Sequence, residues 1–338
     1  MAEINKIAFF EVEDWEKDYI RENLPDTEIK LFNEKLTEKN INEAQDCDAI
    51  AVFIYSRLTK DILSKLPELK LIVTMSTGFD HIDLDECKAR NITVCNVPTY
   101  GENTVAEHTF SLILALSRKI IKSVDRTRTG DFNLDELRGF DLKGKTIGII
   151  GCGNIGKHVV RMAKGFEMNI IVFDLNKDEK YAKELGFSYA DFDELLSKSD
   201  IISLHAPYNE KTHHMINKDN IKKIKKGAYI INTARGGLLD TEALFAALKE
   251  GHIAGAGIDV MEEETTIKEE KELLSADFIK TSNMQTLLEN HMLMHMDNVI
   301  ITPHNAFNSQ EALMRIINTT LENIKDFKNN ECRNSVKK

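Results

Sequence analysis

The sequence lacks the features that mark a secreted, membrane-spanning or zinc-binding protein. Its 338 residues include only 5 cysteines, and none of them belongs to a Cys-x-x-Cys pair, so neither a disulfide framework nor a structural zinc site is predicted. No apolar run approaches the ~18 residues of a membrane span, and the N-terminus lacks a basic region followed by an apolar one. We therefore expect a cytoplasmic protein with reduced thiols.

Positive charge is scarce relative to negative charge. The formal net charge of -11 argues against a nucleic acid or an anionic membrane as the main partner, because either surface would repel most of the protein. Proline is also scarce, with 5 residues, and 42% of the residues are hydrophobic, which is typical of a compact globular protein. A chain of this length exceeds one hydrophobic core, so two domains are expected.

Short apolar runs alternate with amphipathic segments along the whole chain. They lie at 6–10, 49–54, 71–75 and 92–95, and again at 146–150, 170–173, 200–204, 228–232, 256–260 and 298–302. This alternation is typical of parallel strands joined by crossover helices. It predicts an α/β protein with two doubly wound parallel-sheet domains.

Three longer segments are interpreted as helices. The apolar segment 104–121 is predicted to be one buried helix, with the crossing between the domains near its start. Residues 309–330 have apolar side chains at helical spacing and are predicted to return to the first domain. The acidic segment 261–278 contains interleaved Leu, Ile and Phe, which favours a helical insertion over a disordered tail.

A glycine-rich turn follows the strand at 146–150. Gly151, Gly153 and Gly156 form the pattern G-x-G-x-x-G ahead of a predicted helix. The first glycine permits a tight turn, the second lets the backbone approach a pyrophosphate, and the third lets helix and strand pack closely. The next predicted strand ends at Asp174, near the expected offset for an acid that binds the ribose hydroxyls and repels a 2′-phosphate. The pattern predicts NAD rather than NADP.

Ionisable residues follow three predicted strands of the second series. Arg235 follows the strand at 228–232, and His304 follows the last strand. Asp259 lies at the end of the strand at 256–260, and Glu264 lies in the loop after it. Carboxyl ends of parallel strands meet at one edge of a sheet, so these side chains are expected to converge there.

Their chemistry suits the interconversion of a 2-keto acid and a 2-hydroxy acid. Arg235 can bind the substrate carboxylate and polarise the keto oxygen through its planar fork. His304 can donate a proton as hydride arrives from nicotinamide and accept one in the reverse direction. Glu264, bonded to the other ring nitrogen, would favour the charged imidazole. All three are predicted to be catalytic.

The chain resembles the D-2-hydroxyacid dehydrogenase family over nearly its whole length. The matching segments are STGFDHIDL at 76–84, NVPTYGENTVAEHTFSLILAL at 96–116, GFDLKGKTIGIIGCGNIG at 139–156, SLHAPYNEKTHHMIN at 203–217, INTARGG at 231–237, GIDV at 257–260 and TPHNAF at 302–307. The resemblance implies a flavodoxin-like substrate domain formed by residues 1–100 with 304–338, and a Rossmann NAD-binding domain at 101–303. It also implies a homodimer, D stereochemistry and no metal.

The resemblance also assigns residues to the two ligands. The cofactor side comprises Gly151, Gly153, Asn154, Ile155, Gly156, Asp174, Ala206, Pro207, Thr212, Thr233 and Asp259, with Asp259 expected at the nicotinamide carboxamide. The substrate side comprises Ser76, Thr77, Gly78, Tyr100, Arg235 and Phe307, the first three as a loop whose backbone amides bind the substrate carboxylate.

Within the family, the sequence is similar to the D-lactate branch, which implies pyruvate as the substrate. Tyr100, Phe307 and the long insertion after Glu264 carry this similarity. Met75 stands where many relatives have arginine, and Thr265 stands where many have proline. Reduction of glyoxylate, hydroxypyruvate or an aromatic 2-keto acid is the alternative, and an NAD(H)-sensing, corepressor-like binding protein is the alternative from another class.

Five further histidines give weaker signals. His291 and His295 lie four residues apart, as in a helical metal site, but no carboxylate stands at 292. His213 and His214 are interpreted as ordinary surface residues of a polar loop. His108 lies within the predicted buried helix, where it is either structural or lines the cleft.

Overall fold

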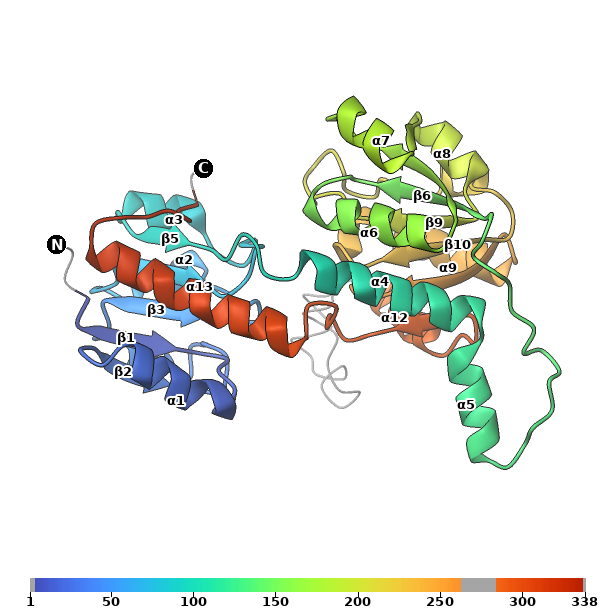
Figure 1. The fold of residues 1–338 in the computed structure, drawn as a ribbon. Coiled ribbons are helices and arrows are strands. Elements are labelled where there is room, and N and C mark those ends of the chain that lie inside the picture. Colours follow the sequence, from blue (N-terminus) through green and yellow to red (C-terminus); the bar gives the residue numbers. More distant parts are fainter. Residues whose placement is uncertain (1–3, 263–283, 337–338) are drawn as a thin grey trace. The chain divides into compact units, whose positions relative to one another are not determined.

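The chain folds into two compact units in a computed structural model that describes residues 4–262 and 284–336 (Figure 1). The first unit comprises residues 1–100 and 309–338, and the second comprises residues 101–308. Residues 304–308, which the sequence analysis places in the first domain, lie in the second unit. His304 therefore belongs to the same unit as Arg235.

The first unit is built around a parallel sheet. Its described elements are β1 (Lys6–Phe9), α1 (Asp14–Asn23), β2 (Glu28–Leu31), η1 (Ile41–Ala44), β3 (Ala49–Val52), α2 (Lys60–Ser64), β4 (Leu71–Thr74), α3 (Leu84–Ala89), β5 (Thr93–Cys95) and α13 (Gln310–Lys328). Among the described residues the strand order is β2-β1-β3-β4-β5, and every pairing is parallel. This order is that of the flavodoxin-like fold.

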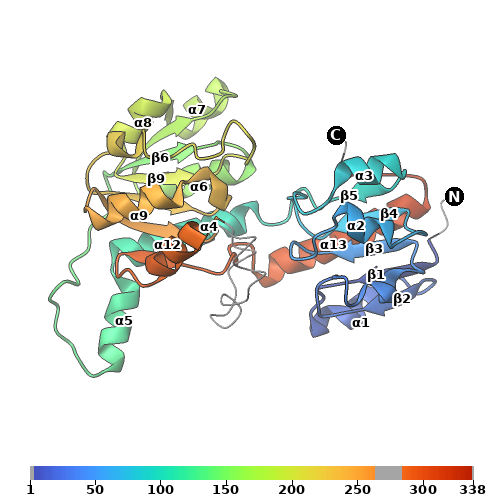
Figure 2. The same cartoon turned by 180° about the vertical axis from the view of Figure 1, so that it is seen from behind.

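Helices cover both faces of this sheet. Strands β3 and β4 are apolar and buried along their length because they lie between two helical layers. α1 and α13 pack on one face (Figure 1), and α2 packs on the face seen after a half turn (Figure 2). α13 therefore carries the C-terminal segment back onto the first unit.

The second unit contains the other parallel sheet. Its described elements are α4 (Glu102–Ser117), α5 (Ile120–Arg128), β6 (Thr146–Ile150), α6 (Asn154–Gly165), β7 (Asn169–Phe173), α7 (Glu179–Leu185), β8 (Ser188–Tyr189), α8 (Phe192–Lys198), β9 (Ile201–Leu204), η2 (Ile221–Lys223), β10 (Ala228–Asn232), η3 (Gly236–Leu238), α9 (Thr241–Lys249), β11 (Ile253–Ile258), α12 (Met284–Met294) and β12 (Val299–Ile301). In the described chain the order is β12-β11-β10-β9-β6-β7-β8. This is the Rossmann order with one further strand, so the predicted fold class is confirmed.

All of the predicted strand segments form strands, but two edge strands are missing from the prediction. β2 is partly exposed and β8 has two residues, so neither has the apolar run of a buried strand. The single helix predicted at 104–121 is wrong. α4 ends at Ser117, whose carbonyl oxygen accepts a hydrogen bond from Phe140 N at 2.9 Å, and Lys119 is left-handed with φ 55°. The helical insertion predicted at 261–278 lies, from residue 263 on, outside the described residues.

In the described parts of the chain, no helix combines the length and the apolar character that crossing a membrane requires.

Candidate active site

Two glycines of the loop after β6 are required by the packing of the protein itself. Gly151 has φ 93°, and a Cβ there would lie 2.7 Å from the backbone nitrogen of Ala206. A Cβ at Gly156 would lie 2.1 Å from the carbonyl oxygen of Gly151. Gly151 therefore lets the loop close against the end of β9, and Gly156 lets α6 pack on the loop.

The remaining glycine of the motif, Gly153, has no such explanation among the described residues. A Cβ there would meet no described atom within 4 Å. Gly153 also precedes α6, whose first turn contains no acidic residue and whose N-terminus has no side-chain cap. Backbone amides and the positive end of the helix dipole fit a pyrophosphate at this point. These residues fit the dinucleotide that the sequence predicts.

Asp174 lies beside the same loop. Its Oδ2 accepts a hydrogen bond from Cys152 N at 2.6 Å, and its Oδ1 accepts one from Asn176 N at 2.8 Å. The carboxylate is half-buried and retains lone pairs for further donors. A fixed carboxylate after β7 fits ribose hydroxyls and repels a 2′-phosphate, which favours NAD.

The remaining cofactor candidates follow β9 and β10. Ala206 and Pro207 follow β9, and Thr212 closes that loop by donating a hydrogen bond from Oγ1 to the carbonyl oxygen of Pro207 at 2.7 Å. Thr233 follows β10 and is buried, with its Oγ1 2.9 Å from Oγ1 of Thr109. These residues therefore lie at the carboxyl edge of the sheet, as the prediction requires.

Arg235 lies in a turn that the side chain of Asn232 stabilises with two hydrogen bonds. The side chain of Asn232 accepts a hydrogen bond from Ala234 N at 3.1 Å and donates one to the carbonyl oxygen of Arg235 at 2.9 Å. Nη1 of Arg235 donates to the carbonyl oxygen of Ala234 at 2.7 Å, and the side chain is half-buried. The turn thus fixes the backbone from which the guanidinium extends.

The loop that carries His304 is held by Asp259. The side chain of Asp259 is 1% exposed, and its two oxygens accept hydrogen bonds from Asn305 N and Ala306 N, each at 3.0 Å. The carbonyl oxygen of Asp259 accepts one from His304 N at 2.9 Å. His304 is left-handed, with φ 52°, a conformation that costs free energy in a non-glycine residue. Asp259, predicted as a cofactor contact, thus also anchors the His304 loop.

His108 supports Asp259 from α4. Its Nε2 lies 3.0 Å from Oγ1 of Thr302 and 3.4 Å from Oδ1 of Asp259. Burial tends to raise the pKa of Asp259, but hydrogen bonds from His108, Thr302 and Ala306 N outweigh it, and the pKa is lowered. The sequence left His108 between a structural role and a place in the cleft, and its position within a largely buried helix was the usable signal for this contact.

The structure brings Arg235, Asp259 and His304 to one edge of the sheet. They follow β10, β11 and β12, which are adjacent in the strand order. A Cβ on Gly236 would lie 2.2 Å from the carbonyl group of Met261, so the turn after Arg235 lies directly against the loop after β11. Glu264, the third predicted catalytic residue, lies outside the described residues, as does Thr265.

The predicted substrate loop belongs to the first unit. Ser76, Thr77 and Gly78 follow β4, where Oγ of Ser76 donates to the carbonyl oxygen of Gly78 at 2.6 Å and Oγ1 of Thr77 donates to that of Val97 at 2.9 Å. Met75 beside them is buried. Tyr100 belongs to the first unit and Phe307 to the second.

Comparisons with known proteins agree with this arrangement. Residues 110–306 match the model of the family described as "D-isomer specific 2-hydroxyacid dehydrogenase, NAD binding domain". The chain is 35% identical to D-lactate dehydrogenase of Escherichia coli over 98% of this chain and 99% of that protein. It is also 35% identical to glyoxylate reductase of Pyrococcus furiosus, over 91% and 84% respectively. The crystal structure of D-lactate dehydrogenase from Aquifex aeolicus, complexed with NAD and lactic acid, has a TM-score of 0.85 and 39% identity, with 96% of each chain covered.

Proposed function

Since this chain belongs to the D-isomer specific 2-hydroxyacid dehydrogenases, which are NAD-dependent oxidoreductases, we propose that it reduces pyruvate to D-lactate and catalyses the reverse reaction. The observation that carries this choice of substrate is the similarity to D-lactate dehydrogenases in sequence and in structure along nearly the full chain. The arrangement of Arg235, Asp259 and His304 after adjacent strands supports the chemistry.

Arg235 has the substrate-binding role in this proposal. A guanidinium has two parallel N–H donors that match a carboxylate, and a further N–H can polarise the keto oxygen. The bonds from Asn232 hold the turn on which this side chain stands, so little reorganisation is needed when the keto acid binds.

His304 has the role of general acid and base. Bound NADH supplies the hydride that C2 of the keto acid accepts. The imidazolium of His304 donates its proton to the keto oxygen, which becomes the hydroxyl of the product, and takes that proton back in the reverse direction. Glu264 keeps in this proposal the role that the family resemblance gives it, as the carboxylate partner of that imidazole.

The remaining substrate contacts in this proposal are those that the family resemblance assigns. Backbone amides of Ser76, Thr77 and Gly78 bind the carboxylate, and the rings of Tyr100 and Phe307 line the space for the methyl group.

Glyoxylate is the second candidate substrate, because glyoxylate reductases match this chain about as well as several of the lactate enzymes do. The Pyrococcus furiosus protein is 35% identical to it. Glyoxylate lacks only the methyl group of pyruvate, and one methyl group in a pocket changes specificity by about 10- to 200-fold at most. The two acids must therefore be compared in the same assay to decide which one is the preferred substrate.

NADH oxidation by the purified protein tests the proposal. Pyruvate, glyoxylate, hydroxypyruvate and phenylpyruvate are compared by kcat/KM, with chiral analysis of each product. Arg235→Ala and His304→Ala should each lower kcat/KM for the preferred acid by about 10²- to 10⁴-fold. Arg333→Ala removes an exposed arginine that pairs with Asp326 in the first unit and serves as the control. A preference for glyoxylate, or L-lactate as the product, would reject the pyruvate assignment.

We further propose that the protein is a homodimer. α5 has no buried residue, and Ile120, Ile121 and Val124 are 41–52% exposed on it. Phe132 and Leu134 in the next segment are 78% and 79% exposed. α5 extends away from the sheet of its own unit (Figure 1), and an exposed apolar surface of this kind is typical of an interface between copies. Light scattering of Ile121→Glu should give the mass of one chain, and that of the wild type the mass of two.

We also propose that the protein acts in the cytoplasm. Its cysteines are all unpaired thiols, four of them buried and Cys332 exposed, as expected in a reducing compartment.

A further inference from the structure

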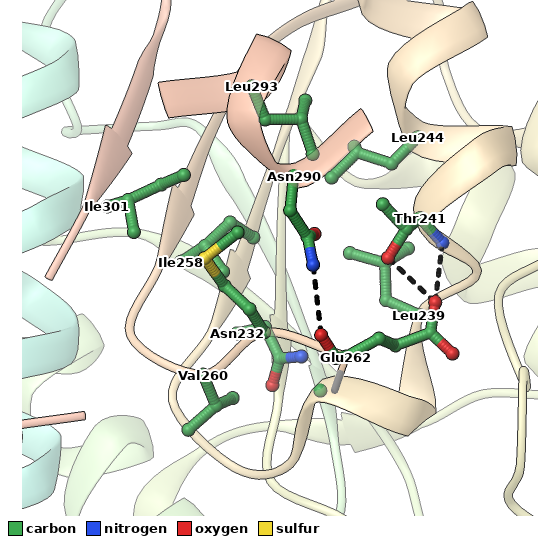
Figure 3. A pocket seen from close by; sticks show the side chains of 12 residues that line it. Asn232, Leu239, Thr241, Leu244, Ile258, Val260, Glu262, Asn290, Leu293 and Ile301 are labelled. Atoms are coloured by element: carbon green, nitrogen blue, oxygen red, sulfur yellow. Dashed lines mark hydrogen bonds between the residues drawn. The ribbon is translucent and has the colours of Figure 1, made fainter. Parts of the chain in front are cut away.

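Glu262 is a half-buried carboxylate in the loop after β11 that the proposed mechanism does not use. Its Oε1 lies 2.5 Å from Nε2 of His214. Its Oε2 accepts hydrogen bonds from the backbone nitrogen of Thr241 at 3.0 Å and from its Oγ1 at 2.7 Å. The carbonyl oxygen of Glu262 accepts one from Nδ2 of Asn290 at 2.9 Å (Figure 3). Glu262, His214, Thr241 and Asn290 form the Glu262 network.

The network joins four segments that are distant in the sequence. His214 lies in the loop after β9, Thr241 begins α9, Glu262 follows β11, and Asn290 belongs to α12. The prediction that His214 is an ordinary surface residue is therefore wrong, since its side chain is 31% exposed and contacts Glu262.

The same segments enclose the turn that follows Arg235. The backbone nitrogen of His214 donates a hydrogen bond to the carbonyl oxygen of Gly237 at 2.8 Å. Gly236 lies so close to Met261 and Glu262 that a Cβ would meet the backbone of both within 2.5 Å. Glu262 thus holds both ends of the turn at 236–241. It bonds directly to Thr241 at one end, and it contacts His214, whose backbone bonds to Gly237, at the other.

The pocket in Figure 3 is too small to be a substrate site. It is lined by residues that include Asn232, Gly236, Thr241, Glu262 and Asn290, and its volume is about 20 Å³. That volume holds about one water molecule. The polar groups around it therefore bind one another rather than a ligand.

We infer that Glu262, together with His214, is a positioning residue that fixes the turn bearing Arg235 in the geometry that keto-acid binding requires; this inference rests on the proposed function. A carboxylate accepts donors from two loops at once through charge-assisted bonds, which no apolar side chain of similar volume can do. A site of this kind loses activity when its supporting contacts let the binding group move by more than about 0.5 Å.

The test compares Glu262→Ala with Glu262→Gln and with Glu250→Ala. Glutamine keeps an acceptor for Thr241, whereas alanine removes every side-chain bond. Glu250 caps the other end of α9, is exposed and pairs with Lys222, so it is a matched control. The measured quantities are kcat, KM for pyruvate, KM for NADH and the midpoint of thermal unfolding.

Glu262→Ala should raise KM for pyruvate about tenfold or more and lower kcat, while KM for NADH stays within about twofold, because Glu262 bonds to none of the residues assigned to the cofactor. Glu262→Gln should recover part of the loss, and Glu250→Ala should match the wild type. A lower unfolding midpoint with unchanged KM and kcat would overturn the inference and leave a purely structural role.

Two further outcomes are also decisive. If Glu262→Ala does not fold, Glu262→Gln and His214→Gln take its place. Each should raise KM for pyruvate while KM for NADH stays unchanged, and an unchanged KM for pyruvate in both would overturn the inference. A wild type that turns over no 2-keto acid would reject the proposed function and this inference together, whereas active wild type with an unaffected Glu262→Ala rejects the inference alone.

Discussion

Replacing Asp259 with asparagine should lower both the stability of the protein and its turnover. One carboxylate accepts hydrogen bonds from Asn305 N and Ala306 N and thereby holds the loop of His304. An asparagine of the same shape keeps one oxygen, but its NH₂ group faces the other backbone donor. The loop then loses one of its two bonds to the side chain of residue 259, and the left-handed backbone of His304 is free to relax.

The expected magnitude follows from the burial of Asp259, which is 1% exposed. A buried donor left without an acceptor costs about 1–3 kcal/mol, and the remaining bonds lose their ionic character, so the total is about 2–4 kcal/mol. Because the imidazole of His304 must lie within hydrogen-bond reach of the keto oxygen, kcat should fall about 10²-fold or more.

Urea unfolding and steady-state kinetics measure the two effects, and Asp200→Asn is the control. Asp200 accepts a hydrogen bond from Thr146 N at 2.9 Å and pairs with Lys225, at the opposite edge of the same sheet. Asp200→Asn should lose stability but keep kcat and KM. Normal turnover in Asp259→Asn, or an equal loss of turnover in both variants, would refute the reasoning about the His304 loop.

The pH dependence of stability gives a second readout of Asp259. Its pKa in the folded protein is lowered from the usual 3.8, so the folded state favours the carboxylate. The stabilisation is present above the unfolded pKa and is lost as the pH falls through the folded pKa. The difference in unfolding free energy between wild type and Asp259→Asn should therefore be constant above about pH 5 and shrink below about pH 4.

The glycine loop and Asp174 give further predictions. Gly153→Ala should leave the unfolding midpoint unchanged but weaken NADH binding about tenfold, because its Cβ would meet no described atom within 4 Å and would stand where the pyrophosphate is expected; weaker folding with normal binding would contradict this. Gly156→Ala should destabilise the fold by about 1–3 kcal/mol, measured by urea unfolding, since its Cβ would meet the Gly151 carbonyl. Asp174→Ala should shift the ratio of kcat/KM for NADPH to that for NADH upward by about tenfold; an unchanged ratio would mean that Asp174 binds only the backbone amides of Cys152 and Asn176.

Most of the fold was predictable because buried parallel strands are apolar throughout. β3, β4 and β9 are buried at every residue, so they appear in the sequence as uninterrupted apolar runs. The edge strand β8 has only two residues, and the end of α4 depends on a bond from Phe140, which is 23 residues away from Ser117. A local pattern carries neither piece of information.

The sequence alone determined the two α/β domains, the glycine loop with Asp174, and the strand ends at which Arg235 and His304 stand, because each depends on residues within one short segment. The tertiary structure decided which of these ends are neighbours, since strand order is set by packing and not by order along the chain. It alone placed His108 against Thr302 across 194 residues and His214 against Glu262 across 48 residues. Such contacts depend on how the strands and helices pack together, and no periodic pattern in the sequence predicts that packing.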